Sequence, residues 1–134
     1  MRNLLTVTAL IEAATGVGLI SVPATVVRLL LGSELLGPGI QLGRLAGVAL
    51  LTLGIACWLA STDTQSCAAR GIVTAMMLYN IGAVLILGAA GLQSQAVGIG
   101  LWPAVILHAA MAVWCITSLW HRRVERTVGV SVSS

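Results

Sequence analysis

Charged residues are scarce in this chain: seven arginines and four acidic residues are only 8% of its 134 residues, and lysine is absent. Soluble domains carry about 25% charged residues, because a folded surface must be wetted. Eleven charged side chains cannot cover a water-soluble globule of this length, whereas 58% of the residues are hydrophobic. The composition therefore excludes a soluble globular domain and predicts one membrane-embedded domain whose two ends face water.

Motifs for catalysis and covalent cross-linking are also missing. The three cysteines, Cys57, Cys67 and Cys115, are odd in number and form no CxxC pair, which argues against a disulfide framework or a thioredoxin-type site. The sequence contains no P-loop, dinucleotide fingerprint, HExxH or hydrolase elbow. We therefore expect no catalytic residues and no metal site, and an enzyme is the less favoured class.

Long apolar runs are what the chain does have. Each is about 20 residues long, which is the length a helix needs to cross about 30 Å of hydrocarbon. The alternation of a membrane barrel strand is absent, so these runs predict helices. They cover residues 4–22, 40–60, 68–92 and 101–120. The predicted fold is an all-α integral membrane four-helix bundle formed by residues 1–123.

Two segments fall outside these spans. Residues 24–31, ATVVRLLL, follow Pro23 and are too short to span a bilayer. They predict a short helix at the membrane interface between spans one and two, with Arg28 reaching for water. Residues 124–134 are polar and lack an apolar face. They predict a flexible cytoplasmic tail.

The arginines indicate how the bundle is oriented. Five lie on the side of the N-terminus and two on the other: Arg2, Arg70, Arg122, Arg123 and Arg126 against Arg28 and Arg44. Because cytoplasmic loops carry the excess of positive charge, both termini are predicted to be cytoplasmic, in a bacterial inner membrane. The arginines lie singly or in one short cluster at the ends of apolar runs and form no basic patch, so nucleic acid is not an expected partner. A cleaved signal peptide is the weaker alternative, because a glutamate interrupts the first run.

That glutamate, Glu12, is the sharpest candidate for a functional residue. An acidic group at the centre of a membrane helix costs about 2.5–3.5 kcal/mol on insertion scales. Thr8, Glu12 and Thr15 are spaced to share one helix face, which should point into the bundle. Glu12 is then either protonated or paired. It serves as a proton site or ligand anchor, or it makes a structural hydrogen bond between helices.

Other polar residues are predicted at a similar depth. Asn80 and Tyr79 lie near the middle of the third span, and His108 lies in the outer half of the fourth. Glu12, Asn80 and His108 therefore predict one polar pocket with Tyr79 or Arg44 at its rim; the alternative is three separate contacts between helices. Arg44 either reaches the interface or folds inward to pair with Glu12.

Cofactors are only partly constrained. His108 and His121 are 13 residues apart, and each would need a facing histidine that the chain does not have, so haem within a monomer is not expected. Quinone remains a candidate ligand. Cys67 is predicted to be exposed and reduced, and Cys57 and Cys115 to be small apolar fillers, with a thiol redox centre as the alternative.

Small residues recur at helical spacing in two spans. Gly43, Gly47 and Gly54 mark one face of the second span, and Gly71, Ala75 and Gly82 mark one of the third. Such faces allow helices to approach closely. They predict internal packing or a homodimer.

Two stretches resemble small bacterial four-helix membrane proteins of the DoxX-like kind. Residues 16–32, GVGLISVPATVVRLLLG, match the end of their first span with its proline and short leucine-rich segment. Residues 44–60, RLAGVALLTLGIACWLA, look like their second span. The resemblance implies a compact bundle with Glu12 and Arg44 as interior polar residues. Some members of this family are linked to thiosulfate–quinone or other membrane redox complexes.

A second likeness is to small multidrug-resistance transporters, which are four-helix chains with an essential glutamate in the first span, here within ALIEAATG. This chain departs from them in its long first loop, in the missing glycine-rich dimer motif of the third span, and in an arginine bias too strong for dual insertion.

The leading functional prediction is a small membrane protein that holds a lipophilic ligand, quinone or lipid, or docks a larger membrane complex. One alternative is a proton-coupled transporter with Glu12 as the proton site. The other is a redox subunit that uses thiols. The expected partners are the lipid bilayer, a lipophilic small molecule, and a homodimer or larger membrane complex.

Overall fold

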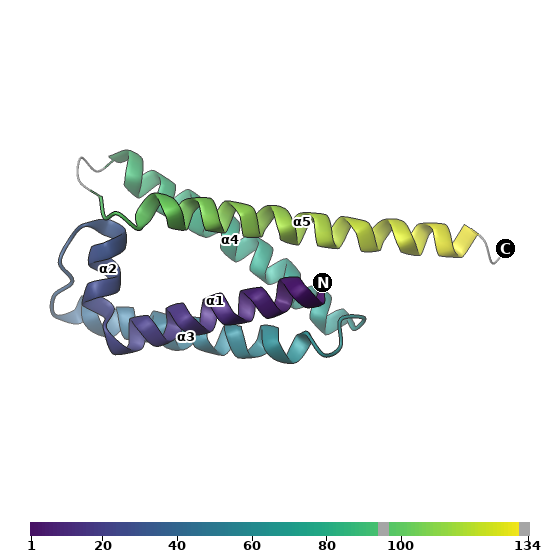
Figure 1. Cartoon of the computed structure of the whole chain (residues 1–134), viewed down its shortest axis with the longest axis horizontal. Helices are drawn as coiled ribbons and strands as arrows, with labels where there is room; N and C mark the ends of the chain where they lie inside the picture. Colours follow the sequence, from purple (N-terminus) through teal and green to yellow (C-terminus); the bar gives the residue numbers. More distant parts are fainter. Residues whose placement is uncertain (94–96, 132–134) are drawn as a thin grey trace.

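The computed structural model describes residues 1–93 and 97–131, and the side chains of those residues up to His121. This described part of the chain is helical and contains no strand (Figure 1). The helices are α1 Arg2–Ser21, α2 Pro23–Leu31, α3 Pro38–Ala60, α4 Cys67–Gln93 and α5 Leu101–Ser131. The all-α prediction is confirmed.

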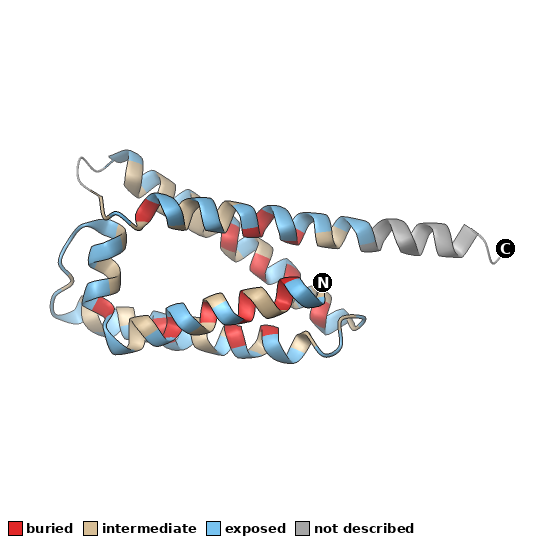
Figure 2. Ribbon diagram, in the orientation of Figure 1, coloured by how far each residue is buried: buried red, intermediate tan, exposed pale blue. Residues whose placement is uncertain are grey.

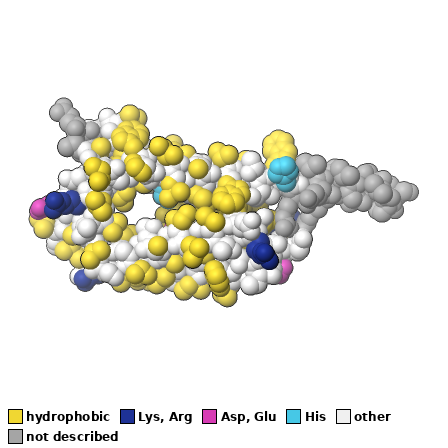
Figure 3. Space-filling view, viewed as in Figure 1, with side chains coloured by type: hydrophobic (Ala, Val, Ile, Leu, Met, Phe, Trp, Pro, Cys, Tyr) yellow, Lys and Arg dark blue, Asp and Glu magenta, His cyan; other side chains and the backbone are white. Residues whose placement is uncertain are grey.

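Four of these helices are long and apolar enough to cross a membrane: α1, α3, α4 and the Leu101–His121 part of α5. Their bounds lie within two residues of the predicted spans, except at the end of α5. Large apolar side chains on the outside of the spans, such as Leu10, Leu45 and Ile86, are exposed. The charged side chains visible on the face in Figure 3 lie near the two ends of the molecule. A water-soluble surface would not have this distribution, whereas a surface in contact with lipid would.

The end of α5 differs from the prediction. The helix continues to Ser131, eleven residues beyond the predicted end of the fourth span at residue 120. The apolar run does end near residue 120, but helical hydrogen bonds need no apolar side chains. No proline follows Pro103, and arginine and glutamate favour helix. Residues 124–131 of the predicted tail are therefore helical, and residues 132–134 lie outside the described residues.

The short second helix is present, as predicted from residues 24–31. Val22 leaves the helical conformation, with φ −136° and ψ 59°, and Pro23 then starts α2. Gly32 ends α2 in the left-handed conformation, with φ 70°, and its N–H donates to the Arg28 carbonyl. A side chain is strained at such a φ, so glycine suits this turn.

The spans pack as two pairs, α1 with α3 and α4 with α5, and the contacts between the pairs are fewer (Figure 1). In the first pair the backbones nearly touch. A Cβ added to Gly47 would lie 2.7 Å from the Gly16 carbonyl oxygen, and one added to Gly54 would lie 3.0 Å from the Ala9 carbonyl oxygen. The small-residue face of α3 is thus used for internal packing.

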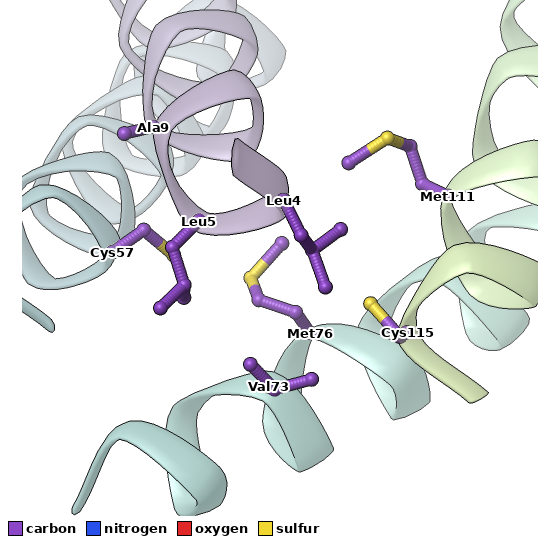
Figure 4. Packing of buried hydrophobic residues seen from close by; sticks show 8 residues of the cluster. All are labelled: Leu4, Leu5, Ala9, Cys57, Val73, Met76, Met111 and Cys115. Carbon is purple, nitrogen blue, oxygen red and sulfur yellow. The ribbon is translucent and has the colours of Figure 1, made fainter. Parts of the chain in front are cut away.

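The two pairs meet at the end of the bundle where α1 begins. Figure 4 shows the apolar cluster that joins them: Leu4, Leu5, Ala9, Cys57, Val73, Met76, Met111 and Cys115. Towards the other end the pairs separate. Residues 81–93, all of them described, include no buried residue (Figure 2), and the space-filling surface is hollowed between the pairs beside α2 (Figure 3). The bundle is therefore closed at one end and open at the other.

Candidate functional site

Glu12 lies near the middle of α1 and is only 4% exposed. Thr8, one turn earlier, is also buried, whereas Thr15 is exposed. The buried residues Thr8, Glu12 and Gly16 are spaced four apart along α1. Thr15 lies beside this buried face rather than on it. Thr8 and Glu12 point into the bundle, as the sequence pattern predicts. Thr15 does not, so that part of the prediction is wrong.

Asn80 and His108 join α4 to α5. Asn80 Oδ1 lies 2.8 Å from His108 Nδ1, and Asn80 Nδ2 donates to the Met76 carbonyl at 2.7 Å. A carbonyl can only accept, so the amide nitrogen must face Met76, and Oδ1 must then accept from the histidine. In the neutral ring the proton is therefore on Nδ1, and Nε2 is left with a free lone pair.

Tyr79 and Glu12 lie beside this pair. The Tyr79 ring meets the His108 ring edge to face, with centroids 5.7 Å apart and planes at 81°. The Glu12 carboxyl is close enough to Tyr79 and to Cys57 for electrostatic interaction. Polar side chains of α1, α4 and α5 thus gather in one region of the interior.

Three polar groups in this region are available to a ligand. Among the described residues, the Glu12 carboxyl, the Tyr79 hydroxyl and His108 Nε2 have no hydrogen-bond partner. In the same part of the chain, no side-chain nitrogen or oxygen is both sealed from water and unpartnered. Each of the three groups must therefore reach accessible space. We call Glu12, Tyr79, Asn80 and His108 the interior polar site.

Arg44 lies outside the interior polar site. Its side chain is exposed on α3, and it makes no ion pair with Glu12 or with any other residue whose side chain is described. The neighbouring residues Gly43 and Gly47 form the face of α3 that meets α2 and α1. Of the five site residues predicted from the sequence, the structure brings together four and leaves Arg44 apart.

Histidines and thiols do not gather into a metal centre. No group of three or more histidine, cysteine or acidic side chains that could hold a metal occurs among the side chains that the structure describes. His121 is exposed near the end of the fourth span. Cys57 and Cys115 are free thiols inside the apolar cluster, and Cys67 is free and exposed at the start of α4. The buried thiols therefore pack as apolar side chains do.

Sequence reasoning missed how the interior polar site is connected. The depth of Asn80 and His108 could be estimated from their positions in the spans. Their direct hydrogen bond depends on how α4 and α5 are rotated about their axes. Apolar residues surround both positions in the sequence, so no signal fixed that rotation.

Comparison of the chain with models of known protein families, with curated proteins and with solved structures finds no match. The fold and the apolar spans define the class, a small membrane protein with four candidate spans. Any more particular function has to be inferred from the interior polar site.

Proposed function

We propose that the protein binds a lipophilic molecule with a polar headgroup, such as a quinone or a lipid, between its two helix pairs. The observation that carries this proposal is the set of unpaired polar groups of Glu12, Tyr79 and His108, which α1, α4 and α5 contribute to the interior of the bundle. The headgroup would occupy the interior polar site, and its apolar tail would leave through the opening towards lipid.

The energetics support a bound headgroup. A polar group held away from water without a hydrogen-bond partner costs about 1–3 kcal/mol. The Tyr79 hydroxyl can donate, His108 Nε2 can accept, and the Glu12 carboxyl can do either according to its protonation. A headgroup that carries oxygen atoms would satisfy these groups together, which gives a reason for their presence among apolar residues.

The cellular setting is part of the same proposal. The arginine distribution supports a bacterial inner membrane with both termini in the cytoplasm. The start of α1 and the far end of α5 lie at the same end of the molecule (Figure 1), as an even number of spans requires. A role as a DoxX-like accessory subunit that docks a larger membrane complex is compatible with this arrangement.

Ligand-induced thermal stabilisation in mild detergent tests the proposal. A panel of quinones and phospholipids is added to the wild-type protein and to Glu12→Gln, Asn80→Ala and His108→Ala. A ligand at 100 times its Kd stabilises a protein by about 2.7 kcal/mol. We expect such a shift with one member of the panel for the wild type and its loss in the three variants.

The matched control is Arg44→Gln, which changes an exposed residue outside the interior polar site. It should keep the full ligand shift. Equal shifts in all variants with every ligand that stabilises the wild type, or no shift with any quinone or lipid in the wild type, would overturn the proposal.

A second candidate function is proton-coupled transport. It is favoured by one observation: Glu12 is buried within a span, and no described cationic side chain pairs with it. A transporter would also have to open the closed end, where Leu4 and Leu5 are packed. Substrate-driven proton movement in proteoliposomes, abolished by Glu12→Gln, would support transport. Unchanged movement in that variant would remove Glu12 from this role.

A further inference from the structure

A groove lies at the α2 end of the molecule, apart from the interior polar site. Its volume is about 540 Å³. One wall is a face of α2 and the other is the segment that follows this helix. The lining includes Thr25, Arg28 and Leu29 on α2, and Glu34, Leu35 and Leu36 on the segment.

Backbone contacts hold this groove in place. Gly32 reverses the chain after α2, so that residues 34–36 return alongside the helix. The Gly100 N–H donates to the Leu29 carbonyl at 2.8 Å. Gly98 lies against the same carbonyl, so closely that a Cβ would collide with it. The α2 wall is therefore fixed to the start of α5.

The charges in the groove are unpaired. Arg28 and Glu34 are both exposed, and neither makes an ion pair with the other or with any described side chain. A cationic and an anionic side chain lie beside each other at this end of the molecule (Figure 3). Leu29 and Leu36, which line the same groove, are 49% and 73% exposed. The groove thus offers one positive group, one negative group and apolar surface.

The position of the groove agrees with the level of lipid headgroups. It lies at the end of the molecule where α1 ends and α3 begins (Figure 1), and its residues belong to none of the four candidate spans. In a bilayer this level holds phosphate and amine groups, with acyl chains directly below. A ligand with both charges and a lipid tail would match the groove.

We propose that this groove binds a zwitterionic phospholipid whose headgroup carries a primary ammonium, as in phosphatidylethanolamine. The Arg28 guanidinium binds the phosphate, and the Glu34 carboxylate accepts hydrogen bonds from the ammonium. The acyl chains lie against Leu29 and Leu36. A choline headgroup has no N–H to donate, and a glycerol headgroup has no cation for Glu34.

Native mass spectrometry of the full chain in mild detergent tests this assignment. Phosphatidylethanolamine, phosphatidylcholine and phosphatidylglycerol with identical acyl chains are added in competition. The wild type should retain phosphatidylethanolamine about tenfold more than phosphatidylcholine, as expected for one charge-assisted hydrogen bond. Glu34→Gln should bring the two lipids to equal retention, and Arg28→Gln should weaken retention of all three.

Two further variants make the result unambiguous. Arg44→Gln removes an exposed arginine at the same end of the bundle but outside the groove, and it should change nothing. Glu34→Lys should reverse the preference towards phosphatidylglycerol, a gain that a misfolded protein would not show. Equal retention of ethanolamine and choline lipids by the wild type would overturn the proposal. So would an effect of Arg44→Gln as large as that of Arg28→Gln, or wild-type retention of phosphatidylglycerol equal to that of phosphatidylethanolamine.

Discussion

The glycines between α1 and α3 face backbone, whereas those of α4 face open space or, at Gly91, the side chains of Leu101 and Trp102 in α5. In the α1/α3 pair, Gly16 and Gly47 bring the two backbones together, and neither position has room for a Cβ. In α4, by contrast, a Cβ at Gly71 or Gly82 would meet no described atom within 4 Å. The α4/α5 pair is joined instead by the Asn80–His108 hydrogen bond and by side-chain packing. One pair is thus held by the close approach of two backbones, and the other mainly by contacts between side chains.

The largest expected effect is at the backbone contact of the first pair. In Gly47→Ala the new Cβ would lie 2.7 Å from the Gly16 carbonyl oxygen and 2.9 Å from the Ile20 nitrogen. Backbone atoms cannot move aside cheaply, so we expect a loss of about 1–3 kcal/mol in the free energy of unfolding. Denaturant unfolding in detergent micelles measures it.

The matched control is Gly82→Ala in the second pair. Open space surrounds this position among the described residues, and alanine favours helix by up to about 1 kcal/mol. Unchanged or slightly higher stability is expected. If Gly82→Ala cost as much as Gly47→Ala, the result would favour the homodimer alternative, in which a second copy of the chain packs on this face.

A smaller effect is expected from the hydrogen bond of the second pair. A double-mutant cycle of Asn80→Ala and His108→Ala should give a coupling energy of about 0.6 kcal/mol, the mean for hydrogen bonds between membrane helices, and at most about 1.7 kcal/mol. The control cycle pairs Asn80→Ala with Thr52→Val. Thr52 bonds to the carbonyl of Ala49 within its own helix, so those two changes should be additive. Zero coupling between positions 80 and 108 would mean that the bond does not hold the pair together.

The Glu12→Gln variant should separate stability from binding. Because the carboxyl has no partner among the described residues, its replacement by an amide of the same shape breaks no hydrogen bond. It should change the unfolding free energy by less than about 0.5 kcal/mol, the lower limit of most point mutations. The ligand shift should nevertheless be lost. A strong destabilisation without ligand would instead indicate a structural role for Glu12 between the pairs.

Labelling of the cysteine thiols should have no effect on stability. It should nevertheless show which end of the molecule faces the cytoplasm. Cys67 is exposed at the start of α4, whereas Cys57 and Cys115 are fully buried in the apolar cluster. A membrane-impermeant maleimide should modify Cys67 alone, and only in inside-out vesicles if the N-terminus is cytoplasmic. Labelling from the outside of intact cells would reverse the proposed orientation.

Much of this fold could be predicted from the sequence, because the length of a membrane helix is set by the bilayer. The spans, the short helix after Pro23 and the inward direction of Glu12 all follow from that constraint and from the cost of burying charge. The way the helices pair could not be predicted. Lipid is as apolar as the bundle interior, so hydrophobicity does not fix the rotation of a helix such as α3, and hence not the outward direction of Arg44.

The attachment of α2 has a mechanical consequence. Its Leu29 carbonyl is bonded to Gly100 at the start of α5, and its first residue, Pro23, lies beside Gly43 of α3. This short helix therefore connects the α1/α3 pair to the α4/α5 pair at the open end of the bundle. The separation of the two pairs at this end is therefore set by contacts of the backbone and of Pro23 rather than by a movable side chain.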